Sequence, residues 1–225
     1  MFVIATKEFL EMMKSFKALL VIALLVLSSY FASSFIASAP AEFMMGTDAY
    51  TAVIRLFLLG FGFVFVLMLS HDVMSREVAS GTMRLLITKT SRIAIIGGKF
   101  LGIAAFWLFS LGVSLAIISF FAKELPWLAF LQLYSFLLFI IGLCLLLSTL
   151  AKSPNVSLLI GLAVSFIAPI IGIWSTFSDK AWLQPFKYIL PYRYQTAENV
   201  SLFVPVLFGI GFLTLATFLF KRGDY

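Results

Sequence analysis

Charged residues are scarce in this chain, and their scarcity excludes a water-soluble domain. Asp, Glu, Lys and Arg make up 12% of the 225 residues, whereas hydrophobic residues make up 62%. The mean hydropathy is +1.10. Because a soluble domain is typically about one quarter charged, this composition cannot supply a water-facing surface on all sides. We predict an integral membrane protein.

Cysteine and histidine are nearly absent, which excludes most disulfide and metal chemistry. The single cysteine, Cys144, lies in an apolar run, so the chain has neither a disulfide framework nor a cysteine-rich metal site. We expect it to be a buried apolar side chain. His71 would have to form a metal site or a catalytic triad without a second imidazole. We therefore predict an interfacial histidine at the end of the second span.

A nucleotide-binding loop and the groups for ion-coupled transport are also missing. The segment Gly97-Gly98-Lys99 looks like part of a phosphate-binding loop, but Ile93 replaces a required glycine and Phe100 replaces the Ser or Thr. No predicted span carries paired carboxylates, a buried lysine or a series of histidines at mid-membrane. We predict that the chain is not an enzyme and binds no cofactor or metal itself.

Six apolar segments are long enough to cross a bilayer, for which a helix needs roughly 20 residues. The predicted spans are residues 18–38, 52–70, 94–121, 128–150, 156–177 and 201–220. Small residues within them are expected to allow close helix contacts, namely Gly60, Gly62, Gly98, Gly102 and Gly112. The predicted fold is an all-α polytopic membrane protein, with residues 1–225 forming a single transmembrane domain.

The distribution of Lys and Arg predicts the orientation of the chain. With the N-terminus inside, eleven of the 16 basic residues lie in inner segments and five in outer segments. Cytoplasmic segments of membrane proteins carry an excess of Lys and Arg. We therefore expect a multi-pass plasma-membrane protein with both termini in the cytoplasm. The basic residues are interpreted as topology signals and contacts to lipid headgroups, not as a nucleic-acid surface.

Residues 2–17 are predicted to form an amphipathic helix in the membrane interface. At about 100° per residue, apolar and charged side chains separate onto two faces. The apolar face comprises Phe2, Ala5, Phe9, Met12, Met13 and Phe16, and the charged face comprises Lys7, Glu11 and Lys14. A cytoplasmic extension of the first span is the alternative.

The cytoplasmic loop, residues 71–93, is the most informative segment. Asp72 or Ser75 is expected to cap a short helix that includes Arg76 and Glu77, and Gly81 then permits a tight turn. A helix, a turn and a second helix between two spans would form a rigid protrusion that transmits force from a partner. A charged loop that serves only topology is the alternative.

The second helix of this loop is predicted to be amphipathic. Ser80 or Thr82 is expected to cap it, and Ser91 to begin the third span. Its apolar face comprises Met83, Leu86 and Ile87, and the opposite face comprises Arg84, Thr88 and Ser91.

The outer loop, residues 178–200, is also too long to be a simple turn. It contains Pro185 and Pro191 together with several Trp, Phe and Tyr residues among its charges. This composition is typical of the headgroup region, and the sequence leaves open whether part of the loop re-enters the membrane.

The order of motifs in the cytoplasmic loop resembles the membrane subunit of type-2 ABC exporters. The family pattern runs from an acidic residue through Gly-Thr, a Leu-rich stretch and Ser-Arg to Gly-Lys. This sequence supplies Glu77, Gly81-Thr82, Leu85-Leu86, Ser91-Arg92 and Gly98-Lys99. It departs from the family at Lys89-Thr90, where a proline is expected. The connection Lys152-Ser153-Pro154 and the basic ending Lys221-Arg222-Gly223-Asp224 also match the layout.

The resemblance implies a permease that dimerises, with itself or with a sister permease, and recruits two copies of a separate ATPase subunit that binds ATP. Residues 72–90 would form the coupling helix seated in a groove of the ATPase, with Glu77 and Arg84 making polar contacts. The implied coupling residues are Arg76, Glu77, Gly81, Thr82, Met83, Arg84, Leu86 and Ile87. The interfacial helix beside them would contribute Lys7, Phe9, Glu11 and Lys14. Substrate would leave toward the outside.

Two other functions remain open on the sequence. A channel or ion-coupled carrier would conduct without nucleotide and would need a polar path, whereas the spans offer mostly Ser, Thr and Gly. A membrane scaffold or immunity-type protein would bind a partner without transport.

Overall fold

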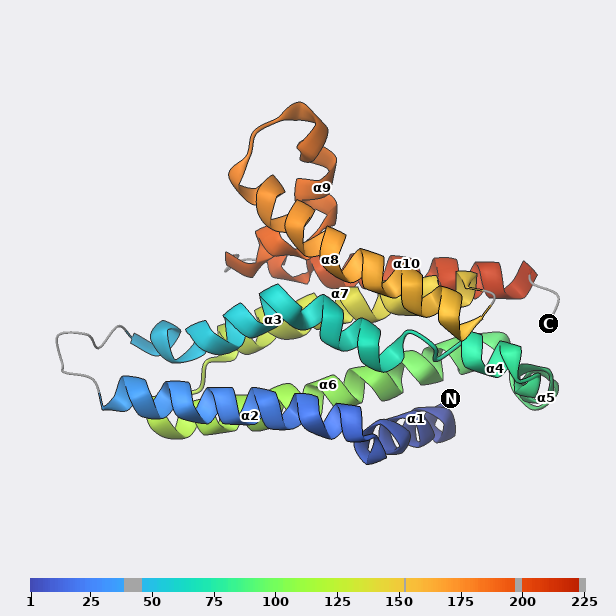
Figure 1. The fold of residues 1–225 in the computed structure, drawn as a ribbon, viewed down its shortest axis with the longest axis horizontal. Coiled ribbons are helices and arrows are strands. Elements are labelled where there is room, and N and C mark those ends of the chain that lie inside the picture. Colours follow the sequence, from blue (N-terminus) through green and yellow to red (C-terminus); the bar gives the residue numbers. More distant parts are fainter. Residues whose placement is uncertain (39–45, 152, 197–199, 223–225) are drawn as a thin grey trace.

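Six long helices dominate the computed structural model, which describes residues 1–38, 46–151, 153–196 and 200–222 (Figure 1). All six are long and apolar enough to cross a membrane, and the described residues contain no strand. These helices are α2 (Phe16–Ala37), α3 (Gly46–Ser70), α6 (Arg92–Ala122), α7 (Trp127–Leu150), α8 (Pro154–Phe177) and α10 (Val204–Arg222). The predicted all-α polytopic membrane fold is confirmed.

The core of the bundle lies around α7. This helix contacts α3, α6, α8 and α10, and one run of its side chains is almost inaccessible to solvent. That run includes Leu133, Phe136, Leu137, Phe139, Ile140 and Ile141. By contrast, α2, α8 and α10 expose many large apolar side chains, as expected of helices that face lipid. The helix α8 is inclined to the others, and the chain after it projects sideways from the bundle (Figure 1).

Shorter helices form both long connections. The connection between α3 and α6 contains α4 (Ser75–Ala79) and α5 (Thr82–Lys89). The connection between α8 and α10 contains η2 (Ala181–Leu183), α9 (Gln184–Ile189), η3 (Pro191–Thr196) and η4 (Val200–Phe203). The two short helices predicted within residues 71–93 are thus present, whereas the described part of residues 178–200, which the sequence marks only as a long loop, consists mostly of short helices.

The first helix is separate from the first span. Helix α1 (Phe2–Lys14) ends at Ser15, whose extended backbone (φ −74°, ψ 128°) breaks the helix before α2 begins at Phe16. The alternative of a continuous extension is therefore wrong. The start of α1 and the last described residues of α10 lie at the same end of the bundle as α4 and α5, which we call the α4–α5 end (Figure 1).

Several predicted details fall outside the described residues or need correction. Lys152 and the terminal Gly223-Asp224 lie outside them. Gly62, Gly98 and Gly102 do stand against neighbouring helices, but Gly60 and Gly112 do not, since a Cβ at either would meet nothing within 4 Å. The prediction of close contacts is wrong at these last two positions.

Candidate functional site

The loop between α3 and α6 folds as two short helices joined at a left-handed glycine. Gly81 adopts φ +72°, and it forms the N-cap of α5 without any side-chain cap. The expected caps are wrong, because α4 begins after Met74 and the hydroxyls of Ser80 and Thr82 instead bond to the carbonyl oxygen of Glu77, each at 3.3 Å. The predicted glycine turn is confirmed, and the hydroxyl bonds fix its geometry.

The start of α4 is attached to the core of the bundle. The backbone N–H groups of Met74 and Ser75 both donate to the Ser148 hydroxyl on α7, at 3.0 and 3.3 Å. The Ser157 hydroxyl on α8 donates to the carbonyl oxygen of His71. The loop therefore starts from a point held by two spans.

The apolar face of α5 packs on this chain itself. Met83 is buried, and Leu86 and Ile87 are half-buried against the core. Arg84 and Leu85 are among the exposed positions of α5, and Leu85 is 66% exposed. An open hollow lined by Val78–Leu85 lies on this outward side. An outside partner can thus contact Arg84 and Leu85, which lie between the predicted apolar positions Met83 and Leu86.

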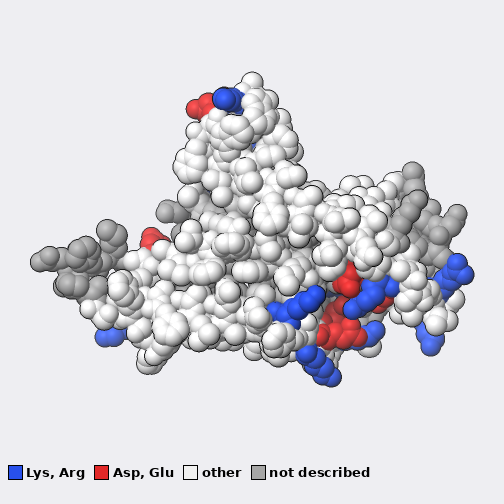
Figure 2. All heavy atoms as spheres, in the orientation of Figure 1, with Lys and Arg blue, Asp and Glu red and all other residues white. Residues whose placement is uncertain are grey.

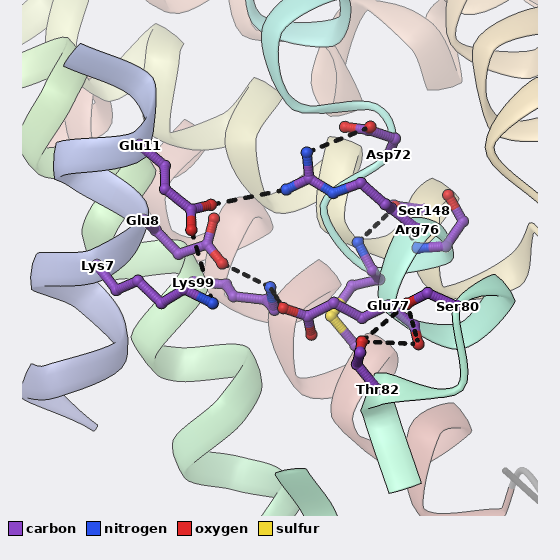
Figure 3. A network of polar contacts seen from close by, with 12 residues as sticks. Lys7, Glu8, Glu11, Asp72, Arg76, Glu77, Ser80, Thr82, Lys99 and Ser148 are labelled. Carbon is purple, nitrogen blue, oxygen red and sulfur yellow. Dashed lines mark hydrogen bonds and ion pairs between the residues drawn. The ribbon is translucent and has the colours of Figure 1, made fainter. Parts of the chain in front are cut away.

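Three helices meet at one fully buried lysine (Figure 3). The Lys99 ammonium on α6 donates to Glu8 Oε1 on α1 at 2.6 Å and to Glu77 Oε1 on α4 at 2.9 Å. Lys99 is inaccessible to solvent and Glu8 is 4% exposed. Lys99 is thus a buried lysine within a predicted span, but it lies near the start of α6 (Arg92–Ala122) and not at mid-membrane, which the prediction concerned. Charge-assisted bonds of this length, shielded from water, tie α1, α4 and α6 together.

Helix α1 lies along α6, and two glycines of α6 allow the close approach. A Cβ at Gly98 would stand 2.8 Å from the Met1 carbonyl oxygen, and a Cβ at Gly102 would stand 2.7 Å from the Ala5 carbonyl oxygen. Further along, Phe9 of α1 packs edge to face with a ring of α6, that of Phe109, at 6.5 Å. Only glycine at these two positions lets the helix backbones touch.

Part of the predicted apolar face of α1 packs on the chain itself. Met12 is buried, and Ala5, Phe9 and Met13 are half-buried. Phe2 and Phe16 are 78% and 79% exposed, so they do not belong to the packed face. Glu8 takes a place on it because its charge is compensated by Lys99.

A more exposed chain of ion pairs extends the junction of α1, α4 and α6. Arg76 lies 3.7 Å from Glu11 and 3.9 Å from Asp72, and Lys7 lies 3.6 Å from Glu11. Solvent-exposed pairs of this length typically contribute about 0–1 kcal/mol each. On the face shown in Figure 2, most charged side chains gather at this end, and the surface between the two ends of the bundle is largely uncharged. Lys14 is exposed on α1 and Thr82 on α5.

A second polar cluster joins α3 to η3, in the connection between α8 and α10. Arg55 Nη1 donates to the carbonyl oxygen of Gln195 at 3.3 Å, and its Nε donates to the Thr51 hydroxyl. The Tyr192 hydroxyl donates to the Leu59 carbonyl oxygen at 3.0 Å. Burial raises the pKa of Tyr192, so the phenol stays neutral and remains a donor. These bonds pin η3 against α3.

The sequence alone did not single out Glu8, Ser148 or the burial of Lys99. Glu8 lies between the two predicted faces of α1, and Ser148 is one of many small polar residues in the spans. Glu8 and Lys99 lie 91 residues apart along the chain, so no local sequence pattern indicates that they form an ion pair. Among the described residues, no group of three or more His, Cys, Asp and Glu side chains could hold a metal ion.

Six helices that are long and apolar enough to cross a bilayer define a multi-pass membrane protein. The family described as ABC-2 family transporter protein matches residues 2–225, so the chain belongs to that family. No curated protein matches the sequence. The resemblance seen in the loop motifs is confirmed over nearly the whole chain. The protein is thus a membrane component of an ABC transporter and not itself the catalytic subunit.

Proposed function

We propose that this chain is the permease subunit of an ATP-driven exporter, which forms the translocation path as a dimer and binds two copies of a separate ATPase. The partner permease is a second copy of this chain or a sister protein. ATP binds to the ATPase subunit only. The observation that carries the proposal is the exposed α4–α5 protrusion, backed by a buried charged junction, in a chain of the ABC-2 family.

The orientation of the proposal follows from the basic residues. Most Lys and Arg of the chain belong to segments at the α4–α5 end, where the charged side chains gather (Figure 2). Because cytoplasmic segments carry this excess, the α4–α5 end faces the cytoplasm of a plasma-membrane protein, and both termini lie on that side. The protrusion is then on the side where ATP is available.

The division of labour within residues 72–90 supports a coupling role. Gly81, Thr82, Arg84 and Leu85 are exposed and border the hollow that a partner would enter. The other implied coupling residues act differently: Met83, Leu86 and Ile87 hold α5 on this chain. Glu77 bonds to Lys99 and does not reach outward. Pressure on the exposed side is thus passed to the bundle.

The experiment tests for the ATPase and for its binding surface. The tagged chain is extracted gently from its native membrane, and copurifying proteins and ATP hydrolysis are measured. We expect a stoichiometric P-loop ATPase, which is lost when an acidic residue is placed on the exposed side of α5 by Leu85→Glu. The control is Ile93→Glu, an exposed apolar position on α6 at the same end, which should retain the ATPase.

Leu86→Glu distinguishes the packing of α5 on this chain from the binding of the ATPase by its exposed side. This position is packed against the chain's own core, so the substitution should lower the yield of folded protein and not only the binding of the ATPase. Repeated purification without any nucleotide-binding partner would overturn the proposal and favour a channel, carrier or scaffold.

A further inference from the structure

We propose that Lys99 is the positioning residue through which movement of the α4–α5 loop reaches α1 and α6 together. This inference rests on the proposed function, since it supposes that an ATPase moves the loop. It concerns a residue in a spanning helix that lies inward of any surface the ATPase could touch, because Lys99 is fully buried.

The geometry places one ammonium between carboxylates on two different helices. Lys99 Nζ is 2.6 Å from Glu8 Oε1 and 2.9 Å from Glu77 Oε1. Two carboxylates and one ammonium leave a formal charge of −1, and Glu77 Oε2 is buried without a hydrogen-bond partner among the described residues. If either α1 or α4 moved away from α6, a buried charge would therefore lose its ionic partner.

The neighbouring contacts limit how α4 and α1 can move relative to α6 and α7. The start of α4 is fixed to α7 through Ser148, and Glu77 lies close behind it, fixed to α6 through Lys99. Along α6, the close approach at Gly98 and Gly102 keeps α1 from sliding past its partner. A force on the exposed end of α5 thus acts on the two contacts of α4, at Ser148 and at Lys99. Because Lys99 belongs to α6 and bonds to Glu8 of α1, movement at this contact shifts both helices.

A lysine suits this task better than an apolar side chain would. A well-packed apolar contact can replace a buried ion pair with little loss of stability, so stability alone gives no reason for the charge. An ammonium has three N–H donors and a flexible stem. It can therefore follow Glu77 as the loop moves while it keeps its bond to Glu8, without leaving either charge unpaired.

The experiment measures hydrogen exchange of the complete permease–ATPase complex without nucleotide and after trapping with ATP and vanadate. In the unaltered complex we expect trapping to change the exchange of α5, α1 and the first turns of α6. The test variant combines Lys99→Met with Glu8→Gln and Glu77→Gln, which removes the ion pairs without leaving a buried charge. We expect it to keep the change on α5 and to lose the changes on α1 and α6. The single variant Lys99→Arg keeps a positive charge at this position. As the conservative control, it should retain the nucleotide-dependent changes on α1 and α6.

A second variant covers the case in which the triple variant does not fold. Glu8→Gln alone leaves the Lys99–Glu77 bond in place, so the nucleotide-dependent change should be lost on α1 and kept on α6. Unaltered changes on α1 and α6 in the variants would overturn the role of Lys99 while leaving the proposed function intact. Absence of any nucleotide-dependent change on α5 in the unaltered complex would overturn the proposed function, and this inference with it.

Discussion

Two glycines of α6 should respond oppositely to the same substitution. At Gly102, a new Cβ would lie 2.7 Å from both the Ala5 carbonyl oxygen and Glu8 Cβ on α1, whereas at Gly112 it would meet nothing within 4 Å. Alanine in place of glycine inside a helix is favourable by about 1 kcal/mol where there is room. Gly112→Ala should therefore be neutral or stabilising, and Gly102→Ala should be destabilising.

The magnitude follows from what must move. Overpacking of a well-filled interior costs about 1–3 kcal/mol, and the upper part of that range applies because backbone atoms of α1 cannot turn aside. Any shift of Glu8 also lengthens its 2.6 Å bond to Lys99. For a chain of this size, about 1 kcal/mol corresponds to roughly 2–4 °C in melting temperature. With about 2–3 kcal/mol of overpacking, the two variants should thus differ by about 4–12 °C in melting temperature.

The assay is thermal unfolding of the purified protein in one detergent, with all three forms measured together. A second readout is the labelling of Met12→Cys, on the buried face of α1, by a bulky maleimide. Labelling should be faster in the Gly102→Ala background than in the Gly112→Ala background, while the buried native Cys144 stays unlabelled in both. Equal melting temperatures and equal labelling rates would refute the docking of α1 on α6.

Two further predictions concern the loop. Ser148→Ala removes the acceptor of the Met74 and Ser75 N–H groups. It should destabilise the protein by about 1–3 kcal/mol and speed the hydrogen exchange of both amides. The control Ser135→Ala removes a hydroxyl that bonds to Gln132 within α7; it should change neither the stability nor the exchange, and equal effects of the two variants would contradict the attachment of α4 to Ser148. Gly81→Val should cost about 1–2 kcal/mol, because only the left-handed backbone and no neighbour resists a side chain there. Gly81→Asn should cost less, and equal unfolding free energies for Val and Asn would contradict that explanation.

Local patterns predicted those features whose causes are local. Gly81 stands between a predicted short helix and a predicted amphipathic helix, and its left-handed turn is confirmed. Ser91 was expected to begin the third span, and it caps α6 by accepting from the Ala94 N–H. The caps of α4 and α5 were predicted wrongly, because several hydroxyls compete there and their choice depends on the carbonyl of Glu77.

The direction of a side chain was harder to predict than the helix that carries it. The apolar residues of α5 were predicted as one face, but sequence periodicity does not say whether that face meets a partner or the chain itself. Met83 is buried in this chain, which leaves Leu85 on the outside. The same holds for Arg55 in α3, because its partner, the Gln195 carbonyl oxygen, lies 140 residues away along the chain.

The sequence by itself determined the class of protein, since a chain with 12% charged residues and six long apolar segments can hide its surface only in lipid. It also determined the family, because the order of motifs in residues 77–99 is local. Only the tertiary structure brought Glu8 and Glu77 to the same ammonium of Lys99. The physical reason is that a buried charge needs a partner in space, and helix packing, not sequence spacing, decides which residues meet.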